Sequence, residues 1–118
     1  MKSIVFDLDD TICYPNHDVK ETHGKYRLAK PNVSLIEKMQ TLKDQGYYII
    51  ISSARRMLTH NGDVGKIVAD VGVVTQDWLA EYEVPYDELV FGKPYASSYY
   101  VDDKAMNINE FMKKDFTS

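Results

Sequence analysis

The stretch SIVFDLDDT (residues 3–11) decides the fold, because an apolar run passes directly into a group of carboxylates. A buried strand that ends on acidic residues places them at the carboxyl edge of a sheet, where open α/β folds bind their ligands. Since strand side chains alternate, we expect Asp7 and Asp9 to project in roughly the same direction. A divalent cation or a shared proton would relieve their repulsion, so the stretch predicts metal binding, acid–base chemistry or both. The alternative is a strand followed by a solvated acidic turn.

The composition is that of one globular domain over residues 1–118, with 44% hydrophobic and 27% charged residues. A net charge of -4 argues against a nucleic-acid partner, which a basic stripe would indicate. Cys13 is the only cysteine, which excludes a disulfide within the chain. The chain starts on a strand without a signal-peptide pattern, and its apolar runs are too short to cross a bilayer. We therefore expect a cytoplasmic protein without a membrane partner.

Residues 12–31 lack helical periodicity, and we expect a loop or small hairpin there that acts as a flap beside the acidic strand end. Helical spacing or strand-like composition predicts the remaining elements. They are a helix from Pro31 to Gly46, a strand over 47–51, one broken helix or two over 63–82, strands over 89–91 and 99–101, and a last helix around 108–112. This order predicts an α/β fold, a Rossmann-like three-layer sandwich with a mostly parallel central sheet.

Polar residues follow four of these strands where each strand ends. They are Asp7 and Asp9, Ser52 and Ser53, Lys93, and Asp102 and Asp103. Parallel strands bring such residues to one edge of the sheet. Each alone has an ordinary explanation as a turn serine, a solvated lysine or a helix cap. Together they supply carboxylates, a hydroxyl and an ammonium, which are the groups that phosphoryl transfer uses.

In this order the motifs resemble those of the haloacid dehalogenase-like phosphatases: DLDDT, the serine after the strand IIIS, Lys93, and VDD. The resemblance implies that Asp7 attacks phosphorus and forms an aspartyl-phosphate. Asp9 would protonate the leaving alcohol and then activate water, steadied by Thr11. Lys93 and a serine hydroxyl would bind phosphate; Ser-Ala-Arg resembles the family's Thr-x-Arg, which favours Ser53, with Ser52 as the alternative.

The same resemblance implies a Mg²⁺ cofactor. Its ligands would be the Asp7 carboxylate, the backbone carbonyl of Asp9, and Asp102, with Asp103 acting directly or through water. Many relatives carry a further acidic residue four positions after the first aspartate of the last motif, where this chain has Met106. The resemblance therefore leaves the outer coordination shell of the metal unassigned.

Longer stretches resemble a group of members without a cap domain, the capsule-biosynthesis phosphatases. These stretches are residues 55–67, Trp78-Leu79, 84–94 and 99–111. The resemblance implies a polysaccharide setting and a phosphorylated sugar or polyol as substrate. Without a cap, specificity would come from the flap, from Arg55, Arg56 and His60, or from a neighbouring subunit of a homo-oligomer. Arg55 could instead pair with an acidic neighbour.

Two other functions must be weighed. A receiver domain of two-component signalling also uses a phosphorylated aspartate, a hydroxyl residue and a lysine, but there the lysine comes last, whereas Lys93 precedes Asp102 and Asp103. A receiver also lacks an acid–base residue at the position of Asp9, because its phosphoaspartate must persist. A noncatalytic scaffold would not need every motif residue. The sequence therefore predicts turnover by a Mg²⁺-dependent phosphomonoester hydrolase.

Overall fold

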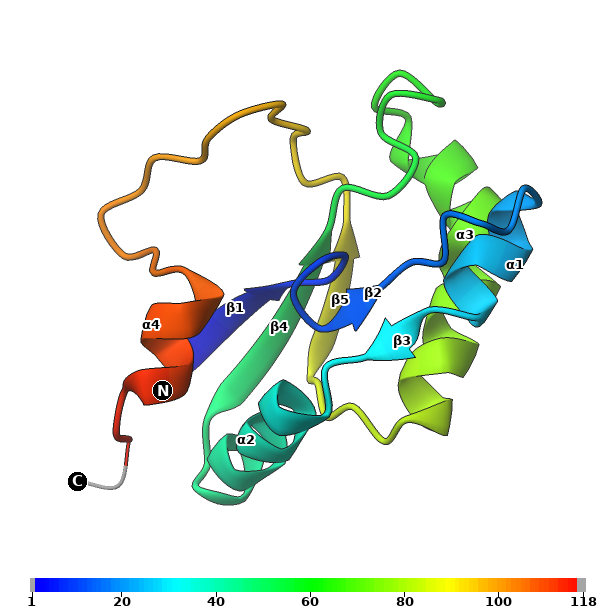
Figure 1. Cartoon of the computed structure of the whole chain (residues 1–118). Coiled ribbons are helices and arrows are strands. Elements are labelled where there is room, and N and C mark those ends of the chain that lie inside the picture. Colours follow the sequence, from blue (N-terminus) through cyan, green and yellow to red (C-terminus); the bar gives the residue numbers. More distant parts are fainter. Residues whose placement is uncertain (1, 117–118) are drawn as a thin grey trace.

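A parallel sheet forms the centre of the protein, whose computed structural model describes residues 2–116 (Figure 1). Its strands are β1 (Ser3–Asp7), β4 (Tyr48–Ser53) and β5 (Glu88–Phe91), in the order β1-β4-β5. Both neighbouring pairs are parallel, and the register places Asp7 opposite Ser52. The predicted α/β, Rossmann-like class with a parallel sheet is confirmed.

The crossover helices begin and end where the sequence signals them. The helix α2 (Val33–Asp44) begins after Asn32, whose side chain accepts a hydrogen bond from the backbone N–H of Leu35 at 3.3 Å. After the helix ends, Gly46 adopts a left-handed conformation with φ 94°. The helix α3 (Val64–Glu81) is continuous, so the break expected in it does not occur. A glycine costs a helix only about 1 kcal/mol, and the buried face of α3, with Val71 at its centre, offsets that cost.

The flap, residues 12–31, is a folded unit and not a loose loop. Its two short strands, β2 (Cys13–Tyr14) and β3 (Lys30–Pro31), pair antiparallel, as the expected hairpin requires. Between them lies α1 (Thr22–Arg27), which the sequence analysis did not predict. Tyr26 of α1 packs with Ile67 and Val71 of α3. The helix is too short for a periodic pattern, and this tertiary contact stabilises it.

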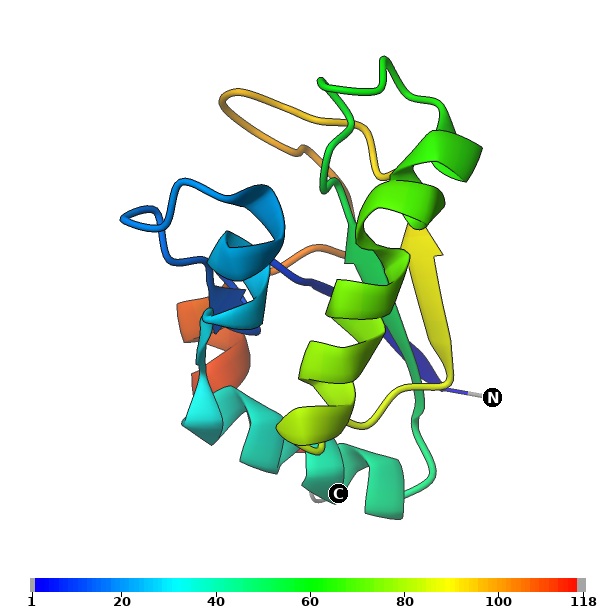
Figure 2. The same cartoon turned by 90° about the vertical axis from the view of Figure 1, so that its right-hand side faces the viewer.

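The core lies on one face of the sheet. Phe6, Ile49 and Ile51 are buried there under the helices, and the ring of Phe111 in α4 (Ile108–Lys113) meets Phe6 edge-on at a centroid distance of 5.3 Å. On the other face Val5 is 61% exposed. Figure 2 shows α3 in front of the sheet, with α1, α2 and α4 to the left of β5. Within residues 2–116 the structure therefore has one helical layer, and the second layer of the expected three-layer sandwich is not seen.

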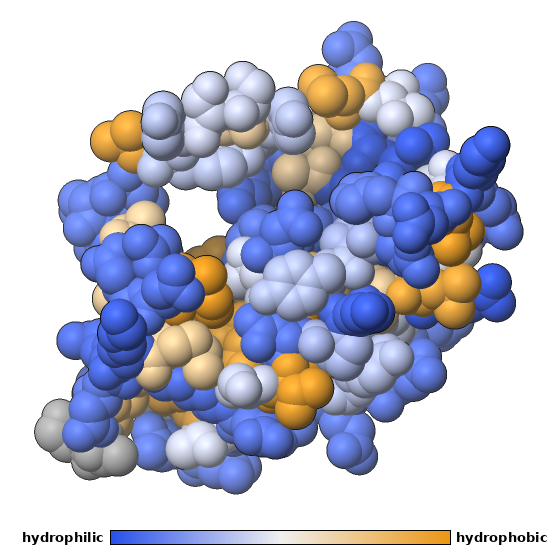
Figure 3. Space-filling model, viewed as in Figure 1, coloured by the Kyte–Doolittle hydropathy of each residue, from blue (hydrophilic) through white to orange (hydrophobic). Residues whose placement is uncertain are grey.

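Residues 92–107 leave the end of β5 as a wide irregular loop that returns to α4 (Figure 1). The strand predicted over 99–101 is wrong, because the chain between β5 and α4 forms no strand. Tyr99 is 85% exposed and Val101 is 97% exposed. The Tyr100 hydroxyl forms local hydrogen bonds in place of strand pairing, since it donates to the Pro94 carbonyl and accepts from the Ala96 N–H. Figure 3 shows an opening between this loop and the body of the molecule.

None of the helices within residues 2–116 combines the length and the apolar character that crossing a bilayer requires.

Candidate active site

Asp7 stands at the carboxyl end of β1 with a partner on each of its oxygens. The Lys93 ammonium, which follows β5, donates to Oδ1 at 3.1 Å, and the Thr11 hydroxyl donates to Oδ2 at 3.3 Å. The Asp7 side chain is still 39% exposed. Asp7 and Lys93 therefore meet at the sheet edge as predicted. Thr11, expected to steady Asp9, bonds to Asp7 here, because the turn after β1, with its Thr11 N–H bonded to the Leu8 carbonyl, returns Thr11 to the strand end.

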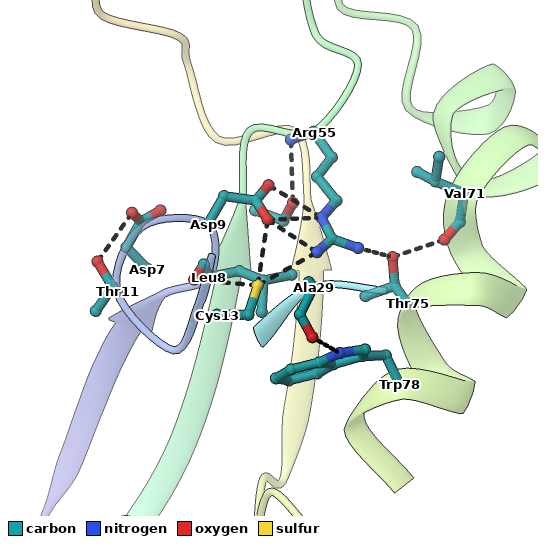
Figure 4. Close-up of polar contacts among 11 residues, drawn as sticks. Asp7, Leu8, Asp9, Thr11, Cys13, Ala29, Arg55, Val71, Thr75 and Trp78 are labelled. Atoms are coloured by element: carbon teal, nitrogen blue, oxygen red, sulfur yellow. Dashed lines mark hydrogen bonds and ion pairs between the residues drawn. The ribbon is translucent and has the colours of Figure 1, made fainter. Parts of the chain in front are cut away.

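Asp9 lies beyond β1, in that turn, and belongs to a different ion pair. Nε of Arg55 lies 3.1 and 3.0 Å from its two carboxylate oxygens, and Nη2 lies 2.8 Å from Oδ1. Figure 4 shows the Asp7 and Asp9 side chains pointing to separate partners. The expectation that they project together is wrong, since strand alternation ends with β1 at Asp7. Each carboxylate has its own cation, which removes much of their mutual repulsion.

Arg55 is enclosed by residues from three elements. Its side chain is 1% exposed, its guanidinium carbon lies 4.0 Å from the centre of the Tyr26 ring, and its Nη1 donates to the Thr75 hydroxyl at 2.8 Å. Burial opposes the charge of Arg55, but the hydrogen bonds and charge of Asp9 outweigh that effect, so the pKa of Arg55 is raised. Of the two roles considered for Arg55, pairing with an acidic neighbour is the one observed.

The two serines after β4 have different surroundings. Ser53 is 1% exposed, and its hydroxyl oxygen accepts a hydrogen bond from the backbone N–H of Arg55 at 3.0 Å. Ser52 is partly exposed and lies in register with Asp7 on the neighbouring strand. The preference for Ser53 as the phosphate ligand finds no support in this geometry, because its hydroxyl is buried and bonded to the backbone. Ser52 has the better position.

A second ionic group, the Asp70 cluster, joins the flap, the loop after β4 and α3. It consists of His23, Arg56, His60 and Asp70. The Asp70 carboxylate accepts hydrogen bonds from Nε2 of His60 at 2.8 Å, from Nε of Arg56 at 2.9 Å and from Nε2 of His23 at 3.1 Å. The hydrogen bond from His60, together with those from Arg56 and His23, lowers the pKa of Asp70 although burial opposes this. Arg56 and His60, predicted to contact substrate, thus bind a carboxylate of the protein itself.

The structure does not bring Asp102 and Asp103 to Asp7. Both are exposed on the loop over residues 92–107, and the Asp102 carboxylate accepts the backbone N–H of Lys104 at 2.8 Å. Across the part of the chain that the structure describes, no three His, Cys, Asp or Glu residues form a group that could hold a metal. With Lys93 and Arg55 beside the two other carboxylates, this arrangement does not fit the predicted Mg²⁺ site.

The fold that carries this site is shared with a solved structure. A crystal structure of an MCSG target from Vibrio cholerae matches with a TM-score of 0.85 and 34% sequence identity, over 98% of this chain and 91% of that chain. The chain belongs to the family of this Vibrio cholerae protein. That protein carries a target name and no functional name. Family membership therefore establishes the fold and leaves the reaction to be argued from the site.

Two structures of the Pnkp1/Rnl/Hen1 complex, one of them described as an RNA repair complex, also match. Their TM-scores are 0.57 and 0.55, with 22% and 20% identity over 86% and 95% of this chain, and over 31% and 30% of theirs. At these identities the likeness shows the fold alone. No family model and no curated protein matches the chain.

In this member of the Vibrio cholerae protein's family, three residues lie around the Asp9–Arg55 pair that the sequence analysis did not connect with it. Tyr26 and Thr75 contact Arg55, and the Cys13 thiol lies 3.4 Å from Oδ1 of Asp9. Burial and the charge of Asp9 raise the pKa of Cys13, so the thiol stays neutral. One signal was present, because Thr75 is the polar residue on the buried face of a long amphipathic helix. Such a residue needs a hydrogen-bond partner.

Proposed function

We propose that the chain is a phosphomonoester hydrolase that forms an aspartyl-phosphate on Asp7. The observation that carries the proposal is the Asp7 carboxylate at an open sheet edge, 39% exposed and 3.1 Å from the Lys93 ammonium. A carboxylate can attack phosphorus if a cation offsets the charge of the incoming phosphate. Lys93 supplies that cation, and the Thr11 hydroxyl orients the attacking group.

The residues take part in two steps. An oxygen of Asp7 forms a bond to phosphorus while the bond to the leaving oxygen breaks, and Asp9, which enters this step protonated, gives that oxygen its proton. Asp9 then takes a proton from water, which attacks the phosphorus and releases inorganic phosphate and free Asp7. Ser52, in register with Asp7, is the proposed hydroxyl donor to a phosphate oxygen, in preference to Ser53.

The superfamily assignment is part of this proposal. The four sequence motifs and the Rossmann-like fold support a haloacid dehalogenase-like phosphatase without a cap domain. We take the substrate to be a phosphorylated sugar or polyol used in capsule polysaccharide biosynthesis, because the longer sequence stretches resemble that group. The net charge of -4 gives no support to a nucleic-acid substrate, although one structural match belongs to an RNA repair complex.

A Mg²⁺ requirement is proposed from the motifs and not from the geometry. Mg²⁺, when bound, would neutralise charge on the phosphate oxygens. Asp7 and the Asp9 carbonyl are fixed by the turn after β1, whereas Asp102 and Asp103 belong to the loop over 92–107, which would have to lie closer to β1. We derive no step of the reaction from the metal.

The test is release of inorganic phosphate by the purified chain. Substrates should include nitrophenyl phosphate, hexose phosphates, polyol phosphates and nucleotides, each with and without Mg²⁺, and Asp7→Asn serves as the inactive control. Steady turnover that Asp7→Asn abolishes supports the proposal. Stoichiometric labelling of Asp7 by acetyl phosphate without turnover would favour a receiver-like signalling domain, and no reaction of either kind would favour a scaffold.

A further inference from the structure

The guanidinium of Arg55 is fixed on three sides by residues from separate elements. Two of its nitrogens donate to the Asp9 carboxylate, and Nη1 donates to Thr75 of α3 at 2.8 Å. The Tyr26 ring of the flap covers one face of the guanidinium, at 4.0 Å from its carbon. Figure 4 shows Arg55 reaching from the end of β4 between Asp9 and α3.

These supports are themselves held in place. The Thr75 hydroxyl donates to the Val71 carbonyl at 2.7 Å, which fixes its lone pairs toward Arg55. Tyr26 is buried and packs with Ile67 and Val71. The guanidinium therefore has little freedom to rotate, and a planar fork with fixed donors imposes one orientation on the carboxylate it binds.

We propose that Arg55 is a positioning residue that aims the Asp9 carboxyl group at the leaving group, and that the flap serves to shield the Arg55 guanidinium from water. The inference rests on the proposed function, in which Asp9 transfers the proton. An ion pair used for stability alone could be replaced by apolar side chains at little cost. Here the pair, of which Arg55 is 1% and Asp9 27% exposed, instead joins the flap and α3 to the residue two positions after the nucleophile.

The flap has a matching arrangement. Cys13, at its start, places its thiol 3.4 Å from Oδ1 of Asp9 and 3.5 Å from Nη2 of Arg55, and it is fully buried. Cys13 and Tyr26 thus cover the guanidinium of Arg55, whose side chain is 1% exposed. The flap contributes to catalysis through Arg55, without touching substrate.

A positioning role predicts a loss that depends on the leaving group. An alkoxide needs a proton as it departs, whereas nitrophenolate needs little help. In Arg55→Met the freed Asp9 carboxylate would take several orientations, and misplacement of a catalytic group by about 1 Å can cost on the order of 10²-fold in rate. We expect a kcat loss of about that size for an alkyl phosphate and a much smaller loss for nitrophenyl phosphate.

The experiment compares these two ester classes in the full chain. The alkyl substrate is whichever of glucose 6-phosphate, sorbitol 6-phosphate and glycerol 3-phosphate the unmodified chain hydrolyses fastest. The test variants are Arg55→Met and Arg55→Lys. The matched control is Arg27→Lys, which makes the same exchange on the exposed face of α1. Arg55→Lys keeps the charge but loses the fork, so it should share the selective loss, while Arg27→Lys should change neither rate.

A double-variant cycle separates positioning from folding. If Arg55 acts through Asp9, Arg55→Met should cost little more in a chain that already carries Asp9→Asn. A purely structural Arg55 would lower both esters by the same factor, and its loss would add to that of Asp9→Asn. If Arg55→Met does not fold, Thr75→Val removes the acceptor of Nη1, and it should give a smaller loss of the same selectivity.

The outcomes also distinguish this inference from the proposed function. No hydrolysis of either ester by the unmodified chain would overturn the proposed function. Hydrolysis of both esters with equal losses in Arg55→Met, or in Thr75→Val where that variant is used, would overturn the inference alone. Hydrolysis of nitrophenyl phosphate but of none of the alkyl phosphates would also overturn it, because Asp9 would then deliver no proton for Arg55 to direct.

Discussion

The Lys93 ammonium and the Asp7 carboxylate, which follow different strands of the sheet, meet at 3.1 Å. The parallel sheet produces this contact, since β1 and β5 flank β4 and all three end on the same side. In the absence of substrate, the two side chains neutralise each other. Under the proposed function, an incoming phosphate would compete with Asp7 for Lys93 and free the carboxylate as it binds.

Replacement of the nucleophile is the first test of this pair. Asp7→Asn keeps the shape of the side chain but removes the charge that attacks phosphorus, so we expect turnover to fall to the background hydrolysis rate. The same change removes the ion pair with Lys93, which is partly exposed, so the stability of the fold should change by only about 1 kcal/mol or less. Phosphate release and thermal unfolding measure the two effects. Undiminished turnover would show that another group is the nucleophile.

The Asp7–Lys93 contact illustrates what the sequence can predict. Apolar runs identified β1, β4 and β5, and helical spacing identified α2. The rule that parallel strands end together then placed Lys93 near Asp7. The direction of Asp9 could not be predicted, because it depends on where β1 stops and on a partner, Arg55, that only the tertiary structure supplies.

The errors over 12–31 and 99–101 have related causes. The helix α1 is short, and its buried face is completed by residues of α3, so no local pattern reveals it. The run Tyr99-Tyr100-Val101 has strand-forming residues, yet strand formation also needs a partner and an apolar surface to cover. The Tyr100 hydroxyl bonds locally instead. Composition over three residues cannot resolve such a competition.

Asp9→Asn should separate proton transfer from nucleophilic attack. We expect turnover of a sugar phosphate to fall by roughly 10²- to 10⁴-fold, as for loss of a general acid. The first chemical step with nitrophenyl phosphate should fall less, because its leaving group needs little protonation. Rapid-quench measurement of that step for both esters is the check. Equal losses would contradict the role of Asp9 as the acid.

Metal removal tests the part of the proposal that the geometry does not support. If Mg²⁺ is required, dialysis against EDTA should abolish phosphate release, and added Mg²⁺ should restore it. Asp102→Asn should then raise the Mg²⁺ concentration needed for half-maximal activity, and Asp18→Asn, on the flap, serves as a control. Full activity in EDTA would show that Lys93 alone provides the charge compensation.

The Asp70 cluster should contribute a pH-dependent share of stability. Since the pKa of Asp70 is lower in the folded state than in the unfolded chain, its stabilisation is present above the unfolded value, about 4, and is lost as the pH falls through the folded value. Asp70→Asn should therefore lower the free energy of unfolding by about 1–2 kcal/mol at neutral pH, and the difference should shrink in acid. Urea denaturation at several pH values measures this.

The same cluster bears on substrate recognition. If Arg56 reads the leaving group, Arg56→Ala should raise KM for the alkyl ester more than KM for nitrophenyl phosphate. If Arg56 serves only to bind Asp70, the ratio of the two KM values should stay constant while the unfolding temperature falls.

For the Asp70→Asn test of pH dependence, a difference in stability that persists unchanged below pH 3 would contradict the charge-based account of the cluster.

The last prediction concerns the two serines after β4, which offer a matched pair. Ser52 lies beside Asp7, so Ser52→Ala should weaken inhibition by inorganic phosphate and raise KM, with little effect on stability. Ser53→Ala removes the buried acceptor of the Arg55 N–H, which should cost about 1–3 kcal/mol of stability because that donor stays buried without a partner. Phosphate inhibition constants and denaturation curves of both variants decide the matter. A change in phosphate affinity confined to Ser53→Ala would restore Ser53 as the ligand and would mean that its hydroxyl leaves the backbone when phosphate binds.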